Sequence, residues 1–114
     1  MAGLAAPQTS TLGVMEGDWP FPQSQNTAVI SQRSVVFEGA PILYVTHDKD
    51  DDGWQFLDGK SNPAPDSAAV VSFAEIVAHD PSLIELADLP AGWVATRRSI
   101  TKPWVRVRRA GNDT

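Results

Sequence analysis

Two β-strands joined by an acidic turn are predicted by residues 42–59, ILYVTHDKDDDGWQFLDG. Residues 42–46 are aliphatic, aromatic or β-branched, as is usual for strands. In the returning segment Trp54 and Phe56 are two residues apart, so a strand places both rings on one face. The turn between the strands holds four aspartates and ends at Gly53, a composition typical of a solvated loop. We therefore expect an antiparallel strand pair here.

Further short β-prone runs lie on both sides of this pair. Upstream, residues 28–31 and 34–37 are rich in valine and isoleucine, and residues 38–41 form a turn. Downstream, residues 93–96 and 104–108 are predicted to be the last two strands. Connections of hairpin length between such runs favour an antiparallel sheet.

Two short helices are predicted between these groups of strands. Ser72 and Glu75 have the spacing of a capping box, which starts a helix whose apolar face is made by Phe73, Ile76 and Val77. Asp80 and Pro81 then suit the cap and first turn of a second helix over residues 80–86. The order of elements predicts an α+β fold: a twisted, mainly antiparallel sheet with one or two short helices on one face.

The chain is predicted to be organised around a single domain. Residues 1–26 are rich in Ala, Pro, Gln, Ser and Thr without a sustained period, and we expect a flexible arm. Within this arm, Trp19 and Phe21 either lie across the core as a strap or form a linear motif for another protein; the strap is favoured because it removes both rings from water. Residues 27–109 form the α+β domain, and residues 110–114 a disordered tail.

Composition narrows the function classes. The 114 residues contain no cysteine, which excludes disulfides, thiolate metal sites and a cysteine nucleophile. No basic, apolar leader and no apolar run of membrane-helix length is found, so the expected location is the cytoplasm, away from membranes. The net charge of −5 argues against nucleic-acid binding by the whole molecule.

The acidic turn fits the start of a calcium-binding loop, D-x-D-x-D-G, with Asp48, Asp50 and Asp52 as candidate ligands. Such a loop needs a glutamate at its twelfth position, which is Gly59 here, and its flanks should be helices. We therefore expect no metal and no cofactor, with weak calcium binding as the alternative.

Catalytic signatures are missing from the sequence. It has no G-x-S-x-G elbow, phosphate-binding glycine loop, dinucleotide fingerprint or H-E-x-x-H helix, so we expect a protein that is not an enzyme. The alternative is a small-ligand site or active site whose pocket lies near Tyr44, His47 and Trp54.

The final strand is basic. Val105 and Val107 are expected to face the core, which turns Trp104, Arg106 and Arg108 outward. Interleaved arginine and tryptophan side chains are typical of surfaces that bind single-stranded nucleic acid, so a nucleic-acid accessory protein is a further alternative. A charged protein partner could use the same side chains.

Several segments between residues 27 and 98 also suggest a family: Val29-Ile30-Ser31, Gly39 with Ile42-Leu43-Tyr44, Asp52-Gly53-Trp54-Gln55-Phe56 with Gly59, Asp80-Pro81-Ser82-Leu83-Ile84-Glu85-Leu86, and Pro90-Ala91-Gly92-Trp93. Together they resemble a bacterial family of small domains of unknown function, some of which are grouped with immunity proteins of polymorphic toxin systems. The resemblance implies a compact α+β fold and, for some members, binding and neutralisation of a toxin. It implies no catalytic residue.

The sequence therefore predicts a small cytosolic, non-enzymatic binding protein that acts by covering a toxin-like partner. Asp50, Asp51 and Asp52 are the residues expected to meet a basic patch on that partner.

Overall fold

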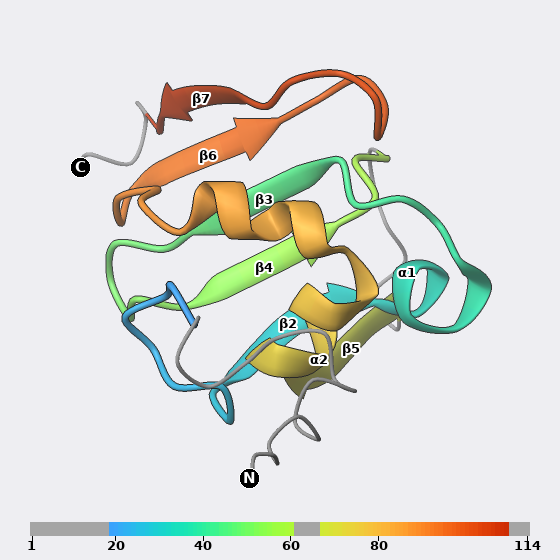
Figure 1. Ribbon diagram of the computed structural model, residues 1–114, viewed down its shortest axis with the longest axis horizontal. Coiled ribbons are helices and arrows are strands. Elements are labelled where there is room, and N and C mark those ends of the chain that lie inside the picture. Colours follow the sequence, from blue (N-terminus) through green and yellow to red (C-terminus); the bar gives the residue numbers. More distant parts are fainter. Residues whose placement is uncertain (1–18, 61–66, 110–114) are drawn as a thin grey trace, which may run out of the picture.

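The computed structural model describes residues 19–60 and 67–109, which form a six-stranded mixed sheet with helices packed on it (Figure 1). The strands are β2 (Ala28–Gln32), β3 (Tyr44–His47), β4 (Trp54–Leu57), β5 (Ala68–Ser72), β6 (Trp93–Thr96) and β7 (Val105–Arg108). Their order across the sheet is β5-β2-β4-β3-β6-β7. Only the β2–β4 pair is parallel among these strands; the other pairs are antiparallel. The predicted α+β class is confirmed.

Within the described residues, three short helices accompany the sheet: α1 (Arg33–Glu38), α2 (Phe73–His79) and the 3-10 helix η4 (Pro81–Leu86). Figure 1 shows α2 in front of β2 and β5, and η4, in orange, in front of β3 and β4. Both predicted caps are confirmed. The Ser72 side chain accepts the amide of Glu75 at 3.1 Å, and the Asp80 side chain accepts the amide of Ser82 at 3.0 Å.

Residues 34–37, predicted as a strand, are helical in α1. A strand would turn Val35 and Phe37 to the same side, whereas the helix buries Val35 completely and leaves Phe37 68% exposed. The guanidinium of Arg33 lies 5.2 Å from the centre of the Phe37 ring and partly covers it. Gly39, with a φ of 76°, ends the helix in the left-handed conformation that glycine adopts without strain.

A single core fills the space between the sheet and the helices. Val45 from β3, Phe56 from β4, and Leu83 and Leu86 from η4 are fully buried in it. Phe73 of α2 lies at the centre of an aromatic cluster with Trp54 and Phe56. Trp54 and Phe56 share the buried face of β4, as their two-residue spacing predicted.

The strap is also confirmed. Phe21 is buried, with its ring centre 4.4 Å from that of Phe73, and Trp19 packs edge-on against Phe73 at 5.3 Å. The last part of the predicted arm therefore belongs to the packed body. Residues 1–18 and the predicted tail, 110–114, lie outside the described residues. Within the described segments, no helix has both the length and the apolar character needed to cross a membrane.

Candidate functional site

The acidic turn is a self-capped hairpin between β3 and β4. The amide of Asp48 donates to the carbonyl of Gly53 at 2.7 Å and closes the turn. The side chain of Asp48 accepts the amide of Asp50, and that of Asp51 accepts the amide of Gly53, both at 2.8 Å. Asp52 has a φ of 62°, a left-handed conformation that aspartate tolerates better than most residues. Three carboxylates thus stabilise the loop or its flanks instead of converging on one point.

Asp52 is held by a hydrogen-bonded chain that reaches the strap. Its Oδ1 lies 2.6 Å from Nε2 of His47, and its Oδ2 accepts from the side-chain amide of Gln23 at 2.7 Å. Nδ1 of His47 lies 2.8 Å from the carbonyl of Leu89, so both ring nitrogens face acceptors. The side-chain oxygen of Gln23 accepts from Nε1 of Trp54. The chain fastens the N-terminal segment to the hairpin.

The pKa of Asp52 is lowered from 3.8, first by the hydrogen bond from Gln23 and then by that from His47. A lowered folded-state pKa adds stability above the unfolded-state pKa, and this stability is lost as the pH falls through the folded value. We expect the melting temperature to decline below about pH 4, and to decline less steeply in Asp52→Asn. Asparagine suits the left-handed φ, and Asp50→Asn is the control of equal charge change. Equal slopes for the two variants in thermal scans would contradict this assignment.

The hairpin has no described metal centre. Within residues 19–60 and 67–109, no three side chains of His, Cys, Asp or Glu gather in a way that could hold an ion. The candidate ligands do not converge, because Asp52 turns toward His47 and Gln23 while Asp48 turns toward its own loop.

The predicted pocket near Tyr44, His47 and Trp54 is not assembled. His47 and Trp54 face the core, are buried, and stack at 4.1 Å between ring centres. Tyr44 is three residues from His47 along β3, so the alternation of the strand places it on the opposite face of the sheet. The prediction grouped residues that are close in sequence but separated by the sheet.

The orientation predicted for the last strand is wrong. Val105 and Val107 are 56% and 53% exposed, and they face away from the helices. Trp104 is partly buried against the core, and Arg106 donates to the carbonyl of Glu85 in η4 at 2.8 Å and to Asp88, which follows η4, at 2.7 Å. The helix layer gives these long side chains their partners. Of the predicted contact residues on this strand, Arg108 alone stays exposed without a described hydrogen bond.

A buried arginine that the sequence did not single out joins several loops. Arg97, which follows β6, donates to the carbonyl of Ile42 from Nε and Nη2, to Asp80 Oδ2 at 2.6 Å, and to Ser82 Oγ at 3.1 Å. Its guanidinium also lies over the Trp104 ring, 4.1 Å from the ring centre. In the sequence Arg97 stands next to Arg98, directly after β6. Nothing in this pattern distinguishes it from an arginine on the surface.

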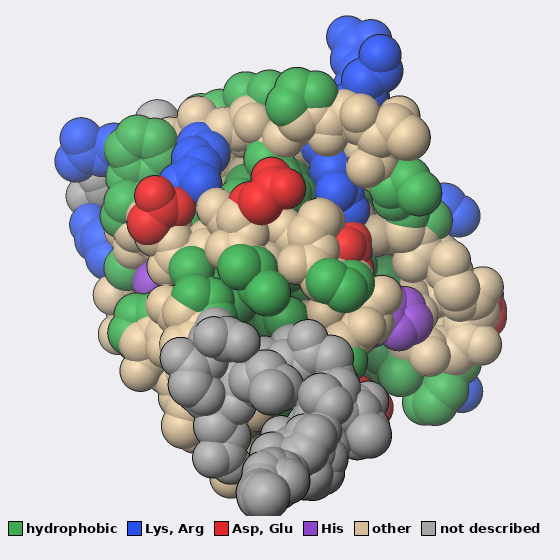
Figure 2. Space-filling model, viewed as in Figure 1, with side chains coloured by type: hydrophobic (Ala, Val, Ile, Leu, Met, Phe, Trp, Pro, Cys, Tyr) green, Lys and Arg blue, Asp and Glu red, His purple; other side chains and the backbone are tan. Residues whose placement is uncertain are grey.

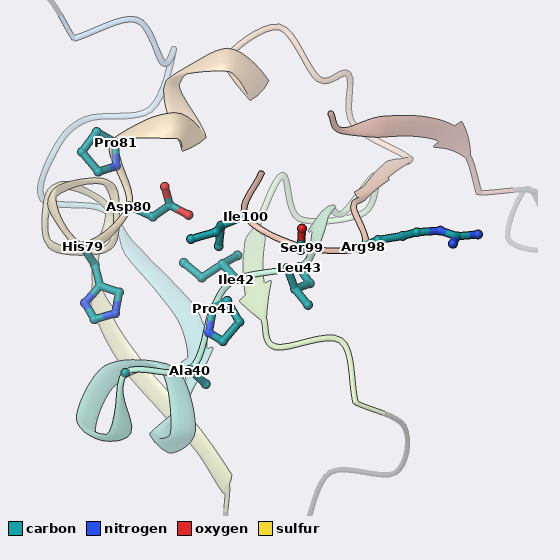
Figure 3. A pocket seen from close by; sticks show the side chains of 11 residues that line it. Ala40, Pro41, Ile42, Leu43, His79, Asp80, Pro81, Arg98, Ser99 and Ile100 are labelled. Atoms are coloured by element: carbon teal, nitrogen blue, oxygen red, sulfur yellow. The ribbon is translucent and has the colours of Figure 1, made fainter. Parts of the chain in front are cut away.

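Next to this arginine, three loops enclose a cavity of about 520 Å³ (Figure 3). They are the α1–β3 connection, the junction of α2 and η4, and the start of the β6–β7 loop. Apolar side chains dominate its lining, with Ile42 and Leu43 from the first loop and Ile100 from the third. Figure 3 shows Ile42 and Ile100 turned toward each other, while the side chain of Arg98 extends away.

Two of the polar side chains that line the cavity have described partners. Asp80 is bound by Arg97 and by the amide and hydroxyl of Ser82. The hydroxyl of Ser99 lies 3.0 Å from that of Thr101. The side chains of His79 and Arg98 also line the cavity, whose size falls in the range of known binding sites.

The comparisons with known proteins add no family to this description. No family model matches the chain, and neither a curated protein nor a solved structure matches it.

Proposed function

We propose that the protein is a non-catalytic binding domain that recognises a partner protein, a role of the kind that its resemblance to immunity-type domains implies. The observation that supports this most directly is the cavity between the three loops, in which Ile42, Leu43 and Ile100 give a mainly apolar lining. Such a lining is typical of sites that bind an apolar group.

An apolar side chain of the partner is the group that this cavity fits. Interfaces are commonly anchored by a few side chains that fill preformed pockets and lose all contact with water. Ile100, 64% exposed at the edge of the cavity, would pack on such an anchor and be covered by it. The cavity therefore explains why a large apolar residue remains in water in the isolated chain.

The acidic hairpin, at the end of β3 opposite the cavity, would assist binding of the partner. Asp50 and Asp51 are exposed there, so they can attract a basic partner over a longer distance. Asp52, Trp104 and Arg106, predicted as contacts as well, are engaged within the chain and would contribute less. The engagement of Trp104 also weakens the nucleic-acid alternative, because a stacking surface needs a free ring.

A cavity variant and a matched control test this function. The wild type, Ile100→Glu and Ile84→Glu are used to capture proteins from cells that naturally produce the chain. Ile84 is also exposed and apolar, but it lies on η4 outside the cavity lining. We expect one stoichiometric partner with the wild type and the control, and its loss with Ile100→Glu.

The captured partner is then purified and titrated by calorimetry. Burying a glutamate in the cavity should weaken binding by about 30-fold or more. A partner that stops growth when expressed alone, and is neutralised by co-expression of this chain, would place it in the toxin class. Equal affinity of Ile100→Glu and wild type would overturn the proposal.

A further inference from the structure

Among the described residues, the helices pack on one face of the sheet, and the strand residues on the opposite face, called here the open face, are uncharged. The strand register places one residue from each strand in a row across it: Val70, Ile30, Gln55, Thr46, Val94 and Val107. A second row beside it includes Leu57, Tyr44, Thr96 and Val105. None of these positions is charged, whereas the helix side shows side chains of both signs (Figure 2).

Apolar side chains on this open face are strongly exposed. Val70 is 70% exposed on β5, and Val105 and Val107 are each more than half exposed on β7, so the two outer strands form apolar ridges. Thr46 and Val94 lie between them and are nearly buried. Val105 and Val107 are neighbours on one side of β7, and exposed apolar side chains that adjoin in this way are typical of surfaces that bind another molecule.

Two oppositely charged hollows lie at opposite ends of the open face, the acidic one beside β2 and β4 and the basic one beside β6 and β7. At the hairpin end, on the β2 side, a hollow of about 150 Å³ is lined by Ile30, Gln55, Asp48 and Asp51. At the other end, on the β7 side, a hollow of about 390 Å³ is lined by Thr96, Val105, Arg98 and Lys102. The antiparallel path of β3, β6 and β7 places the β6–β7 loop at the end of the sheet opposite the hairpin.

We infer that a second copy of this chain covers the open face and forms a two-fold symmetric dimer. A two-fold axis in the plane of the open face can place the acidic hollow of each copy against the basic hollow of the other. The dimer then contains two equivalent charge contacts. Because each copy has a net charge of −5, association is least opposed through an uncharged face.

The size of the face sets the expected affinity. Six strands about 4.8 Å apart and four or five residues long give a footprint of roughly 25 by 15 Å. Because side chains make the surface uneven, two such faces together bury on the order of 1,000 Å² of accessible surface, which is near the lower limit for specific interfaces. We therefore expect a dimer with a Kd in the micromolar range.

Sedimentation equilibrium from about 1 to 500 μM tests the dimer, spanning that range on both sides. The wild type should shift with concentration from the monomer mass of 12.3 kDa to twice that value. Val107→Lys, an exposed edge-strand position that tolerates lysine, should weaken association by about 30-fold or more. Ile84→Lys on the helix side should leave it unchanged. A wild type that stays monomeric, or a dimer unaffected by Val107→Lys, would overturn the inference.

A charge exchange tests the two-fold arrangement. Asp51→Lys and Lys102→Glu should each weaken the dimer by about tenfold, since each places like charges together. The double variant should regain wild-type association. Failure of the double variant to recover, with its helix and strand content intact by circular dichroism, would refute this arrangement.

The result is separable from the proposed function. Ile100→Glu should dimerise normally, since Ile100 lines the cavity and not the open face. Dimerisation lost in Ile100→Glu but kept in Val107→Lys would contradict the placement of the interface, whatever partner the cavity binds.

Discussion

Arg97→Met is expected to lower the free energy of unfolding by about 3 kcal/mol. The side chain of Arg97 is 3% exposed, and its loss would leave the carbonyl of Ile42 and Oδ2 of Asp80 without their donors, while Ser82 still donates to Oδ1. The side chain of Asp80 is 20% exposed and can be partly rehydrated, which places the effect at the lower end for a broken buried pair. Urea unfolding followed by tryptophan fluorescence measures the change.

Arg106→Met is the matched control for this effect. Arg106 also pairs with an aspartate at 2.7 Å, but its partner Asp88 is 80% exposed and the pair is screened by water. Its loss should be far smaller than that of Arg97. Similar losses in the two variants would mean that the loop junction does not depend on the buried guanidinium.

Phe73→Ala is expected to cost about 3–5 kcal/mol, enough to unfold a domain of ordinary stability at physiological temperature. The ring of Phe73 is fully buried and contacts rings from the strap and from the sheet, so truncation leaves a cavity where these parts meet. Phe37→Ala removes the same group from a 68% exposed position and should change stability by less than about 0.5 kcal/mol. Thermal unfolding of the two variants measures this difference in stability. A small loss of stability in Phe73→Ala would show that the aromatic cluster repacks around the missing ring.

Local signals in the sequence predicted α2, η4 and the central hairpin correctly, whereas the residues of α1 were predicted as a strand. The caps of α2 and η4 involve residues within three positions of each other, so their chemistry is visible in the sequence. The alternation of Trp54 and Phe56 fixed the buried face of β4 for the same reason. Strand β5, Ala68–Ser72, had no prediction because its run of alanine and valine lacks alternation, and its partner β2 is distant in sequence.

Features decided by tertiary packing were missed. The orientation of β7 depends on η4 and the residues that follow it, where a backbone carbonyl and Asp88 accept from Arg106 on one side of the strand, while nothing described covers the valines on the other side. The cavity depends on three loops that meet only in the folded chain. Arg97 illustrates the limit best, because its burial is set by Ile42, Asp80 and Trp104, each from a different segment.

The bonds of Gln23 link the charge of the hairpin to the order of the N-terminal segment. The side-chain amide of Gln23 donates to Oδ2 of Asp52, while its backbone carbonyl accepts from Nε1 of Trp19 at 2.6 Å. One residue thus fastens Trp19 and the hairpin carboxylate, so displacement of this segment would also remove the donor that lowers the pKa of Asp52 most.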